Sequence, residues 1–336
     1  MRLTHYLLIV VLCALPLGVS AAGKLGISDA AATSTEGLHL DWLDRSVNPA
    51  QNFFGYANGN WQKSNPIPPA YSTWGTFNIL QNQNEDTIHQ ILENAAKNTQ
   101  AQPGSDTRKI GDFYYSGMDE AAINQAGIKP LEPELERIAN IENQKQLQTE
   151  IARLQMLGVN ALFGMGQMQD FKDSTQVIGV VGQGGLGLPD RDYYLKKDPK
   201  FAKIRVAYVQ HIARSLELLG DTQDNATREA GIVMDIETNL AKASMSQVQQ
   251  RDPLAVYHVM NLVQLDKTTP NFSWQDYFAN LGHPELKSIN LEMPKFFKSM
   301  SMQLKSVPLS NWKTYLRWQL LDAFAPYLSR PFVDED

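Results

Sequence analysis

The histidines and the single cysteine limit the chemistry that this chain can perform. Zinc hydrolases place two imidazoles four residues apart on one helix face, with an intervening glutamate as the base. The six histidines are His5, His39, His89, His211, His258 and His283, and no two of them have that spacing. The lone Cys13 excludes a disulfide scaffold, a thiolate zinc site and a CxxC redox pair. Local motifs therefore predict no catalytic residue and no metal site, and any metal would need His and carboxylate ligands.

A glycine-rich stretch from Gly182 to Gly187 has the formal pattern GxGxxG and directly follows an apolar run. A dinucleotide fingerprint must open a helix whose N-terminus holds the pyrophosphate. The turn sequence Pro189-Asp-Arg-Asp192 follows instead, so we interpret the glycines as positions of close packing and a tight turn. Carboxylates such as Asp190 and Asp192 could act as an acid–base pair, but the sequence does not place them across a cleft.

The composition indicates a globular protein without an affinity for polyanions. The chain has 336 residues, of which 43% are hydrophobic and 20% charged, which is enough to bury a sizeable core. Its net charge of −6 has the wrong sign for a dedicated nucleic-acid surface or an anionic-lipid surface. We therefore expect no nucleic-acid partner.

The first residues have the features of a secretory signal peptide. Arg2 precedes an apolar run from Tyr6 to Leu17, and the small residues before Ala22 predict cleavage after Ala21. The run is shorter than the ~20 residues that a membrane-spanning helix needs. We therefore predict a signal peptide over residues 1–21, no retained membrane anchor and a periplasmic or secreted protein. A mature chain without cysteine favours the bacterial periplasm.

The elements that position any functional residue begin after a leader. Residues 22–37 are rich in Ala, Ser, Thr and Gly and are typical of a flexible leader. Between Trp42 and Trp74 the chain combines aromatic side chains with Asn, Gly and four prolines, and we expect an irregular segment without regular helix or strand.

Beyond residue 76 the apolar residues recur mostly at helical spacing. Between Ala161 and Leu188 the pattern changes to alternating and β-branched residues, which predicts a two- or three-stranded antiparallel sheet. The fold class is therefore mainly α with a small antiparallel β-sheet. Helices are expected over Phe77 to Leu92, from about Ser105 through Tyr114, and over Leu131 to Ile141, Leu147 to Leu157, Pro199 to Leu219, Thr222 to about Gln249, Ser273 to Asn280 and Ser310 to Leu328.

Several longer motifs, spread from about Leu38 to Asp336, together resemble the N-terminal half of the neprilysin and endothelin-converting-enzyme family of zinc metallopeptidases. This spaced agreement is more specific than any single short motif. The motifs are Asn52-Phe-Phe-Gly-Tyr-Ala-Asn-Gly-Asn-Trp61, Ile67-Pro-Pro, Trp74-Gly-Thr-Phe77, Lys109-Ile-Gly-Asp-Phe-Tyr-Tyr115, Gly184-Gly-Leu-Gly-Leu-Pro-Asp-Arg-Asp-Tyr-Tyr194, Arg251-Asp-Pro253 and Trp312-Lys-Thr-Tyr-Leu-Arg-Trp318.

The resemblance implies a large helical capping domain over residues 77–336 and a strap over residues 38–76 that would dock on a catalytic domain. In the family, the HExxH helix and the third zinc ligand lie in the second half of the chain, which this sequence does not contain. We therefore expect a truncated enzyme whose catalytic domain is missing. Zinc is the cofactor of the full-length family, and this chain alone is expected to bind none and to be inactive. The implied partners are peptide substrates of modest size and a missing catalytic half.

The resemblance also implies one substrate-facing segment, from Ser72 to Gln81. Its Phe77 corresponds to the aromatic residue that lines the S1′ pocket, with Asn78 next to it. Thr73 and Gln81 stand where neprilysin has two arginines, so endopeptidase behaviour is expected rather than capture of a free C-terminal carboxylate. For Phe77 the alternative is a core residue on a helix face. For the whole chain the alternative is a non-enzymatic periplasmic peptide-binding module, or a subunit that reassembles with a separately encoded catalytic half.

Overall fold

The computed structural model describes residues 39–336, so the predicted signal peptide and leader lie outside the described residues. The packing divides the chain into two compact units, with the division between Leu92 and Glu93. We call residues 39–92 the N-terminal unit and residues 93–336 the C-terminal unit, and describe each by itself. The predicted boundary between strap and capping domain, after residue 76, stays a prediction.

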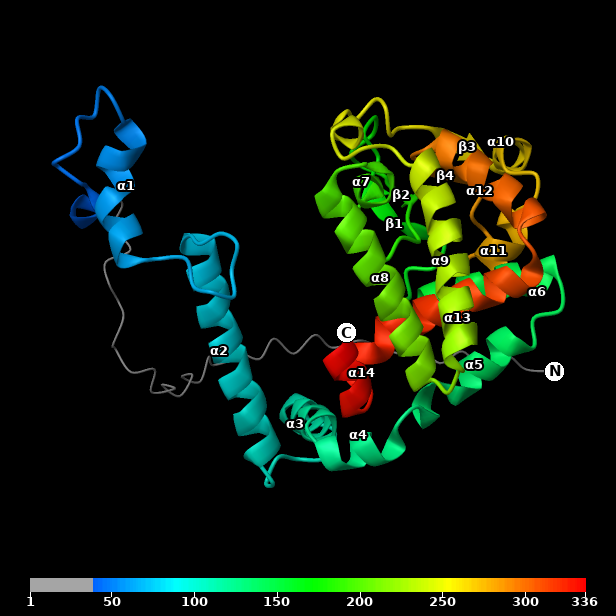
Figure 1. Ribbon diagram of the computed structural model, residues 1–336, viewed down its shortest axis with the longest axis horizontal. Coiled ribbons are helices and arrows are strands. Elements are labelled where there is room, and N and C mark those ends of the chain that lie inside the picture. Colours follow the sequence, from blue (N-terminus) through cyan, green and yellow to red (C-terminus); the bar gives the residue numbers. More distant parts are fainter. Residues whose placement is uncertain (1–38) are drawn as a thin grey trace, which may run out of the picture. The chain divides into compact units, whose positions relative to one another are not determined.

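The N-terminal unit consists of helical elements joined by loops (Figure 1). They are η1 (Leu40–Trp42), α1 (Phe53–Ser64) and α2 (Thr76–Lys97), whose last turn lies beyond the division. The expectation of an irregular segment between Trp42 and Trp74 is wrong, because α1 is a regular helix of 12 residues.

Glycines in α1 mark close contacts, which is why the sequence did not indicate a helix. The Asn52 side chain caps α1 by accepting a hydrogen bond from the Gly55 N–H at 2.8 Å. A Cβ on Gly55 would lie 2.7 Å from Asn52 Nδ2, and one on Gly59 would lie 2.7 Å from Asp44 Cβ. Gly59 therefore requires glycine, and a side chain at Gly55 would displace the capping Asn52, although glycine disfavours a helix by roughly 0.5–1 kcal/mol relative to alanine.

Asp44 joins the segment after η1 to α1. Its backbone N–H donates to the Tyr56 carbonyl at 2.8 Å, and its carboxylate accepts a hydrogen bond from Lys63 Nζ at 2.7 Å. This bond, followed by those from Ser46, lowers the pKa of Asp44 to about 2. Polar contacts around Asp44 thus connect the segment after η1 to α1, and η1, α1 and α2 contain no buried residue.

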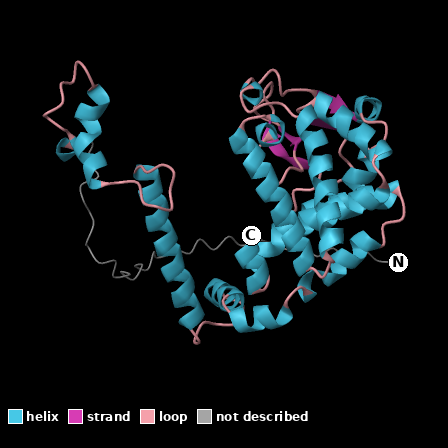
Figure 2. Cartoon of the chain, in the orientation of Figure 1, coloured by secondary structure: helices cyan, strands magenta, loops and turns pink. Residues whose placement is uncertain are grey.

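Helices dominate the C-terminal unit, as predicted (Figure 2). Residues 39–336 include no helix that is both long and apolar enough to cross a bilayer. The helix predicted from Thr222 ends earlier, at Ala243. The helices are α3 (Asp106–Gly117), α4 (Glu120–Ala126), η2 (Lys129–Leu131), α5 (Glu132–Ala139), α6 (Gln144–Met156), α7 (Arg191–Leu195), α8 (Pro199–Leu218), α9 (Gln223–Ala243), η3 (Gln249–Arg251), α10 (Leu262–Thr268), α11 (Trp274–Asn280), α12 (Pro294–Ser306), α13 (Leu309–Phe324), η4 (Ala325–Tyr327) and α14 (Arg330–Glu335).

The sheet of this unit is mixed rather than purely antiparallel. Its strands are β1 (Phe163–Gln169), β2 (Val177–Gln183), β3 (Val259–Asn261) and β4 (Ser288–Leu291), in the order β1-β2-β4-β3. The antiparallel pair β1 and β2 confirms the prediction for this region. The prediction was wrong about the rest of the sheet, because β4 pairs parallel to β2. Strands of three or four residues are too short to show an alternating pattern in the sequence.

The core of the C-terminal unit is built around Phe163, at the start of β1, which is fully buried. Its ring lies within 5.3–5.8 Å, centroid to centroid, of the rings of Phe272, Trp274, Tyr277 and Phe297. These residues come from the segment before α11, from α11 itself and from α12. A single aromatic cluster therefore connects the sheet to helices more than a hundred residues further along the chain.

The glycine-rich loop after β2 packs against tyrosine hydroxyl groups, as expected for close packing. Gly185 has a φ of +71°, and a Cβ there would lie 2.5 Å from the Tyr315 hydroxyl. That hydroxyl donates to the Gly185 carbonyl at 2.9 Å and accepts from the Leu162 N–H at 3.0 Å. A Cβ on Gly187 would lie 1.9 Å from the Tyr208 hydroxyl. The loop needs glycine for its own packing.

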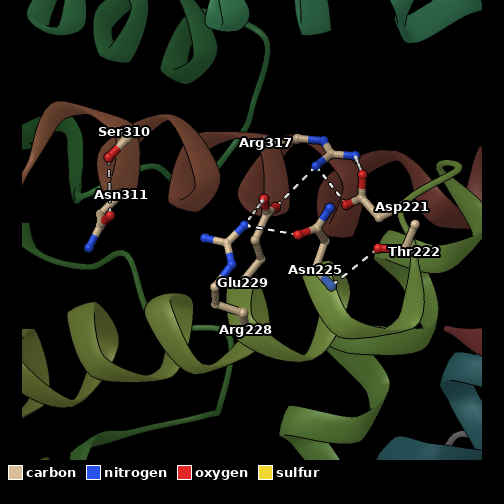
Figure 3. A network of polar contacts seen from close by, with 8 residues as sticks. All are labelled: Asp221, Thr222, Asn225, Arg228, Glu229, Ser310, Asn311 and Arg317. Carbon is tan, nitrogen blue, oxygen red and sulfur yellow. Dashed lines mark hydrogen bonds and ion pairs between the residues drawn. The ribbon is translucent and has the colours of Figure 1, made fainter.

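Polar side chains of α13 connect this helix to the turn between α8 and α9 (Figure 3). The Arg317 guanidinium donates to both carboxylate oxygens of Asp221, at 2.7 and 2.9 Å, and to Glu229 at 3.1 Å. Lys313 of the same helix donates to the Ile141 carbonyl at 2.8 Å. The motif around Trp312 to Trp318 therefore joins several elements of the C-terminal unit.

Candidate functional site

The predicted substrate-facing segment forms a loop followed by the first turns of α2. The Tyr71 hydroxyl donates to Asn82 Oδ1 at 2.9 Å, and the Tyr71 ring meets the edge of Trp74 at 4.8 Å between centroids. These two contacts fold the loop back on α2. Thr73 lies exposed between these two aromatic residues, before the helix begins.

Phe77 stands in the first turn of α2 and exposes 90% of its surface. The alternative that it is a core residue is therefore wrong for this chain. Gln81, four residues later, shares the same helix face and donates to Glu85 at 2.8 Å. Asn78 is half-buried beside them. The structure thus places Phe77 and Gln81 on one accessible face.

This face can supply an apolar contact and amide hydrogen bonds, but no chemistry of its own. An exposed phenyl ring contributes about 1.5–3 kcal/mol when a partner buries it. The positions of Thr73 and Gln81 carry no positive charge, so the segment offers no guanidinium to a carboxylate. The segment is therefore suited to lining a pocket that other residues complete.

A fully buried carboxylate, Glu237 of α9, lies at the centre of a second polar cluster. Its oxygens accept hydrogen bonds from the hydroxyls of Tyr194 at 2.7 Å and Tyr208 at 3.0 Å, and from Gln319 Nε2 at 3.1 Å. The Tyr194 hydroxyl accepts from the Leu188 N–H at 2.9 Å. The carboxylate therefore connects the glycine-rich loop to α7, α8, α9 and α13.

Burial raises the pKa of Glu237 to about 8, although the hydrogen bonds from Tyr194 and Tyr208 act in the opposite direction. A carboxylate without a cationic partner is costly to keep charged away from water. Glu237 therefore retains its proton through a range in which a solvent-exposed glutamate has lost it. Its burial on every side leaves no room for a substrate, so we assign it a structural role.

One group of described residues could hold a metal ion: His211, Asp322 and Asp336. The first two are half-buried and the third is exposed. No motif in the sequence indicates this group, because its members lie on α8, on α13 and after α14.

For Glu237, in contrast, the sequence does indicate a buried position. It stands four residues after Val233 and three before Leu240, so it lies on the apolar face of α9. A glutamate at such a position must find buried hydrogen-bond donors. The sequence could not show that the donors are two tyrosines and a glutamine from other helices.

Comparisons with known proteins agree on one family. A family model described as peptidase family M13 matches residues 49–336. Neprilysin-3 of Drosophila melanogaster is 30% identical over 316 residues, which is 88% of this chain and 40% of the relative. Endothelin-converting enzyme 1 of Mus musculus is 29% identical over 324 residues, which is 92% of this chain and 41% of the relative.

Solved structures share the fold. The zinc metalloprotease Zmp1 of Mycobacterium tuberculosis, in complex with an inhibitor, superposes with a TM-score of 0.82 at 32% identity, covering 89% of this chain and 46% of that protein. PepO of Lactobacillus rhamnosus, at 18% identity and a TM-score of 0.65, shares the fold. This chain spans less than half of the length of each of these proteins.

Proposed function

The chain belongs to peptidase family M13, and on this premise we propose that it is the N-terminal capping region of a neprilysin-like zinc endopeptidase. In this role it limits access to peptides of modest size and contributes to the S1′ side through Phe77. The observation that carries the proposal is the shared fold, at a TM-score of 0.82 over 89% of this chain, with part of a mycobacterial zinc metalloprotease.

We further propose that this chain does not hydrolyse peptides by itself. The HExxH motif that the family resemblance implies does not occur in its sequence. Without that pair of imidazoles and the glutamate base, water is not activated for attack on a peptide bond. Incubation of the purified chain with an internally quenched peptide and added Zn²⁺ should give no cleavage, whereas chelator-sensitive cleavage would contradict this part of the proposal.

The contribution of Phe77 to substrate binding can be tested in a chimera. In this chimera, residues 39–336 replace the matching part of the M. tuberculosis metalloprotease. Phe77→Ala should raise KM about tenfold or more for peptides with a large apolar P1′ side chain, because an apolar contact is lost. Phe113→Ala on α3 is the matched control, since Phe113 is 82% exposed.

A second candidate function is a subunit that reassembles with a separately encoded catalytic half, or a peptide-binding module without activity. The absence of buried residues from η1, α1 and α2 favours reassembly, because Phe53, Phe54 and Phe77 expose most of their surface. Co-purification of a polypeptide that carries HExxH would support it. A stable monomer that binds no such polypeptide would count against it.

The proposed location is the periplasm or the medium, after cleavage behind Ala21. The support is the order of charge, apolar run and small residues before Ala22. N-terminal sequencing of the chain recovered from a periplasmic or secreted fraction should begin at Ala22. An intact N-terminus starting at Met1 would contradict this localisation.

A further inference from the structure

Three elements of the C-terminal unit bring together the ligand-bearing side chains of His211, Asp322 and Asp336. A ring nitrogen of His211 and one carboxylate oxygen of each aspartate all lie within 4.8 Å of one another. His211 belongs to α8, Asp322 to α13, and Asp336 follows α14. Side chains that converge from such distant parts of the chain form a defined cluster rather than a run of like charges.

The His211 ring is oriented by a carboxylate that is itself fixed. Its Nδ1 lies 3.0 Å from Glu335 Oε1. Both oxygens of Glu335 are bonded to the Arg214 guanidinium at 2.7 Å, which keeps this carboxylate ionised and leaves it able only to accept. Nδ1 is therefore the nitrogen that donates to Glu335, which leaves Nε2 as the ring nitrogen available to a metal ion when the ring is neutral.

The edge of Trp318 further restrains this ring, with 5.4 Å between the two centroids. A histidine whose other nitrogen donates to a carboxylate is the usual arrangement behind a metal-ligating imidazole. The cluster thus has one imidazole that is prepared for coordination before any ion arrives.

Among the described residues, no lysine or arginine forms an ion pair with either of the two aspartates. No hydrogen bond or ion pair from another described residue to the carboxylate of Asp322 is found, and Arg214 is already engaged by Glu335. Two carboxylate oxygens and one imidazole nitrogen are a donor set that suits Zn²⁺ and neighbouring divalent transition metals.

The spacing also suits such an ion. Zinc binds nitrogen and oxygen ligands at about 2.0–2.2 Å, so the ligand atoms of one ion are roughly 3.3 Å apart. Separations of up to 4.8 Å need only a small movement. Asp336 can make it, because its side chain is exposed.

We propose that His211, Asp322 and Asp336 bind one divalent transition-metal ion of the Zn²⁺ class. The ion would link α8 and α13 to the end of α14. It would stabilise the folded C-terminal unit rather than catalyse a reaction, since an ion that binds only the folded state adds to its stability. This proposal does not depend on the proposed peptidase function.

Equilibrium dialysis of the full chain against Zn²⁺ at neutral pH tests the proposal. We expect one zinc per chain and a rise in the melting temperature on zinc addition. Asp322→Asn and His211→Ala should each weaken zinc binding by at least tenfold. Glu335→Gln should weaken it by about ten- to a hundredfold, because the imidazole loses the partner that orients it.

The matched control is His283→Ala. His283 also has its Nδ1 3.0 Å from a carboxylate, that of Glu285, but it is exposed and lies outside the cluster. This variant should bind zinc like the parent chain.

Circular dichroism should establish that each variant is folded, and if His211→Ala is not, the nearly isosteric Asp322→Asn decides the result. No stoichiometric zinc on the parent chain, or equal affinity in Asp322→Asn, would overturn the proposal.

Discussion

The two units of this chain are stabilised in different ways. The C-terminal unit has a continuous core in which Phe163 and its aromatic neighbours are almost inaccessible to water. The N-terminal unit has no buried apolar side chain in η1, α1 or α2, and polar contacts around Asp44 connect the segment after η1 to α1. The C-terminal unit therefore has an interior that excludes water, whereas the N-terminal unit exposes large apolar side chains such as Phe53 and Phe77.

The largest expected difference comes from the same substitution made in both units. Phe163→Ala should lower the free energy of unfolding by about 3–5 kcal/mol, because it opens a cavity in a dense core. Phe53→Ala, at a residue that is 70% exposed, should change it by no more than about 0.5 kcal/mol. Urea denaturation measures both values, and similar losses in the two variants would refute the comparison.

The next effect concerns pH and the buried carboxylate. Since the pKa of Glu237 is raised to about 8, the folded state binds a proton that the unfolded chain releases above its ordinary pKa near 4.5. The contribution of Glu237 to the free energy of unfolding should therefore be most favourable at low pH and should be lost as the pH rises through about 8. Glu237→Gln should remove this slope, which is on the order of a few kcal/mol between pH 5 and 8.

The measurement is the unfolding free energy against pH, with a chelator present to exclude bound metal. Glu217→Gln, on the exposed side of α8, is the control and should keep the slope of the parent chain. A slope that persists in Glu237→Gln would show that other groups set the pH dependence.

A smaller effect is expected from two glycine-to-alanine substitutions that should change the stability in opposite directions. Gly185→Ala should destabilise the chain by about 1–3 kcal/mol, because φ is +71° and a Cβ would meet the Leu162 backbone at 2.8 Å. Gly231→Ala in α9 should stabilise it by roughly 0.5–1 kcal/mol, since no atom lies within 4 Å of the added Cβ. Thermal unfolding compares the two, and equal signs would contradict the packing described for the loop.

The smallest effect on global unfolding is expected in the N-terminal unit. Asp44→Asn removes the ion pair with Lys63 and should increase amide hydrogen exchange in α1 while leaving that of the C-terminal unit unchanged. Because the pKa of Asp44 is lowered to about 2, the parent contact should persist above pH 4 and be lost only as the pH falls toward 2. Increased exchange throughout both units would indicate that the units unfold together.

The sequence predicts most of the C-terminal unit because its helices carry long apolar stripes. Prediction from the sequence fails where contacts with distant segments of the chain determine the structure. The glycines of α1 resemble helix breakers but make room for Asn52 and Asp44. Strand β4 has four residues and exists because β2 and β3 pair with it.

The candidate sites also differ in whether the sequence could predict them. The segment around Phe77 could be named only through the family resemblance, since an exposed phenylalanine on a polar helix has no local explanation. The cluster of His211, Asp322 and Asp336 has no sequence signal, because only the packing of α8, α13 and α14 brings its residues together.

The hydroxyl of Tyr315 has a further consequence, for the order of folding. It bonds to Leu162, 153 residues earlier in the chain, and to Gly185, 130 residues earlier. The start of β1 and the glycine-rich loop therefore cannot reach their final arrangement until α13 has emerged. Contacts of such large sequence separation slow folding and prolong the exposure of apolar surface. We expect the earlier part of the chain to rely on chaperones until residues near 315 have been synthesised.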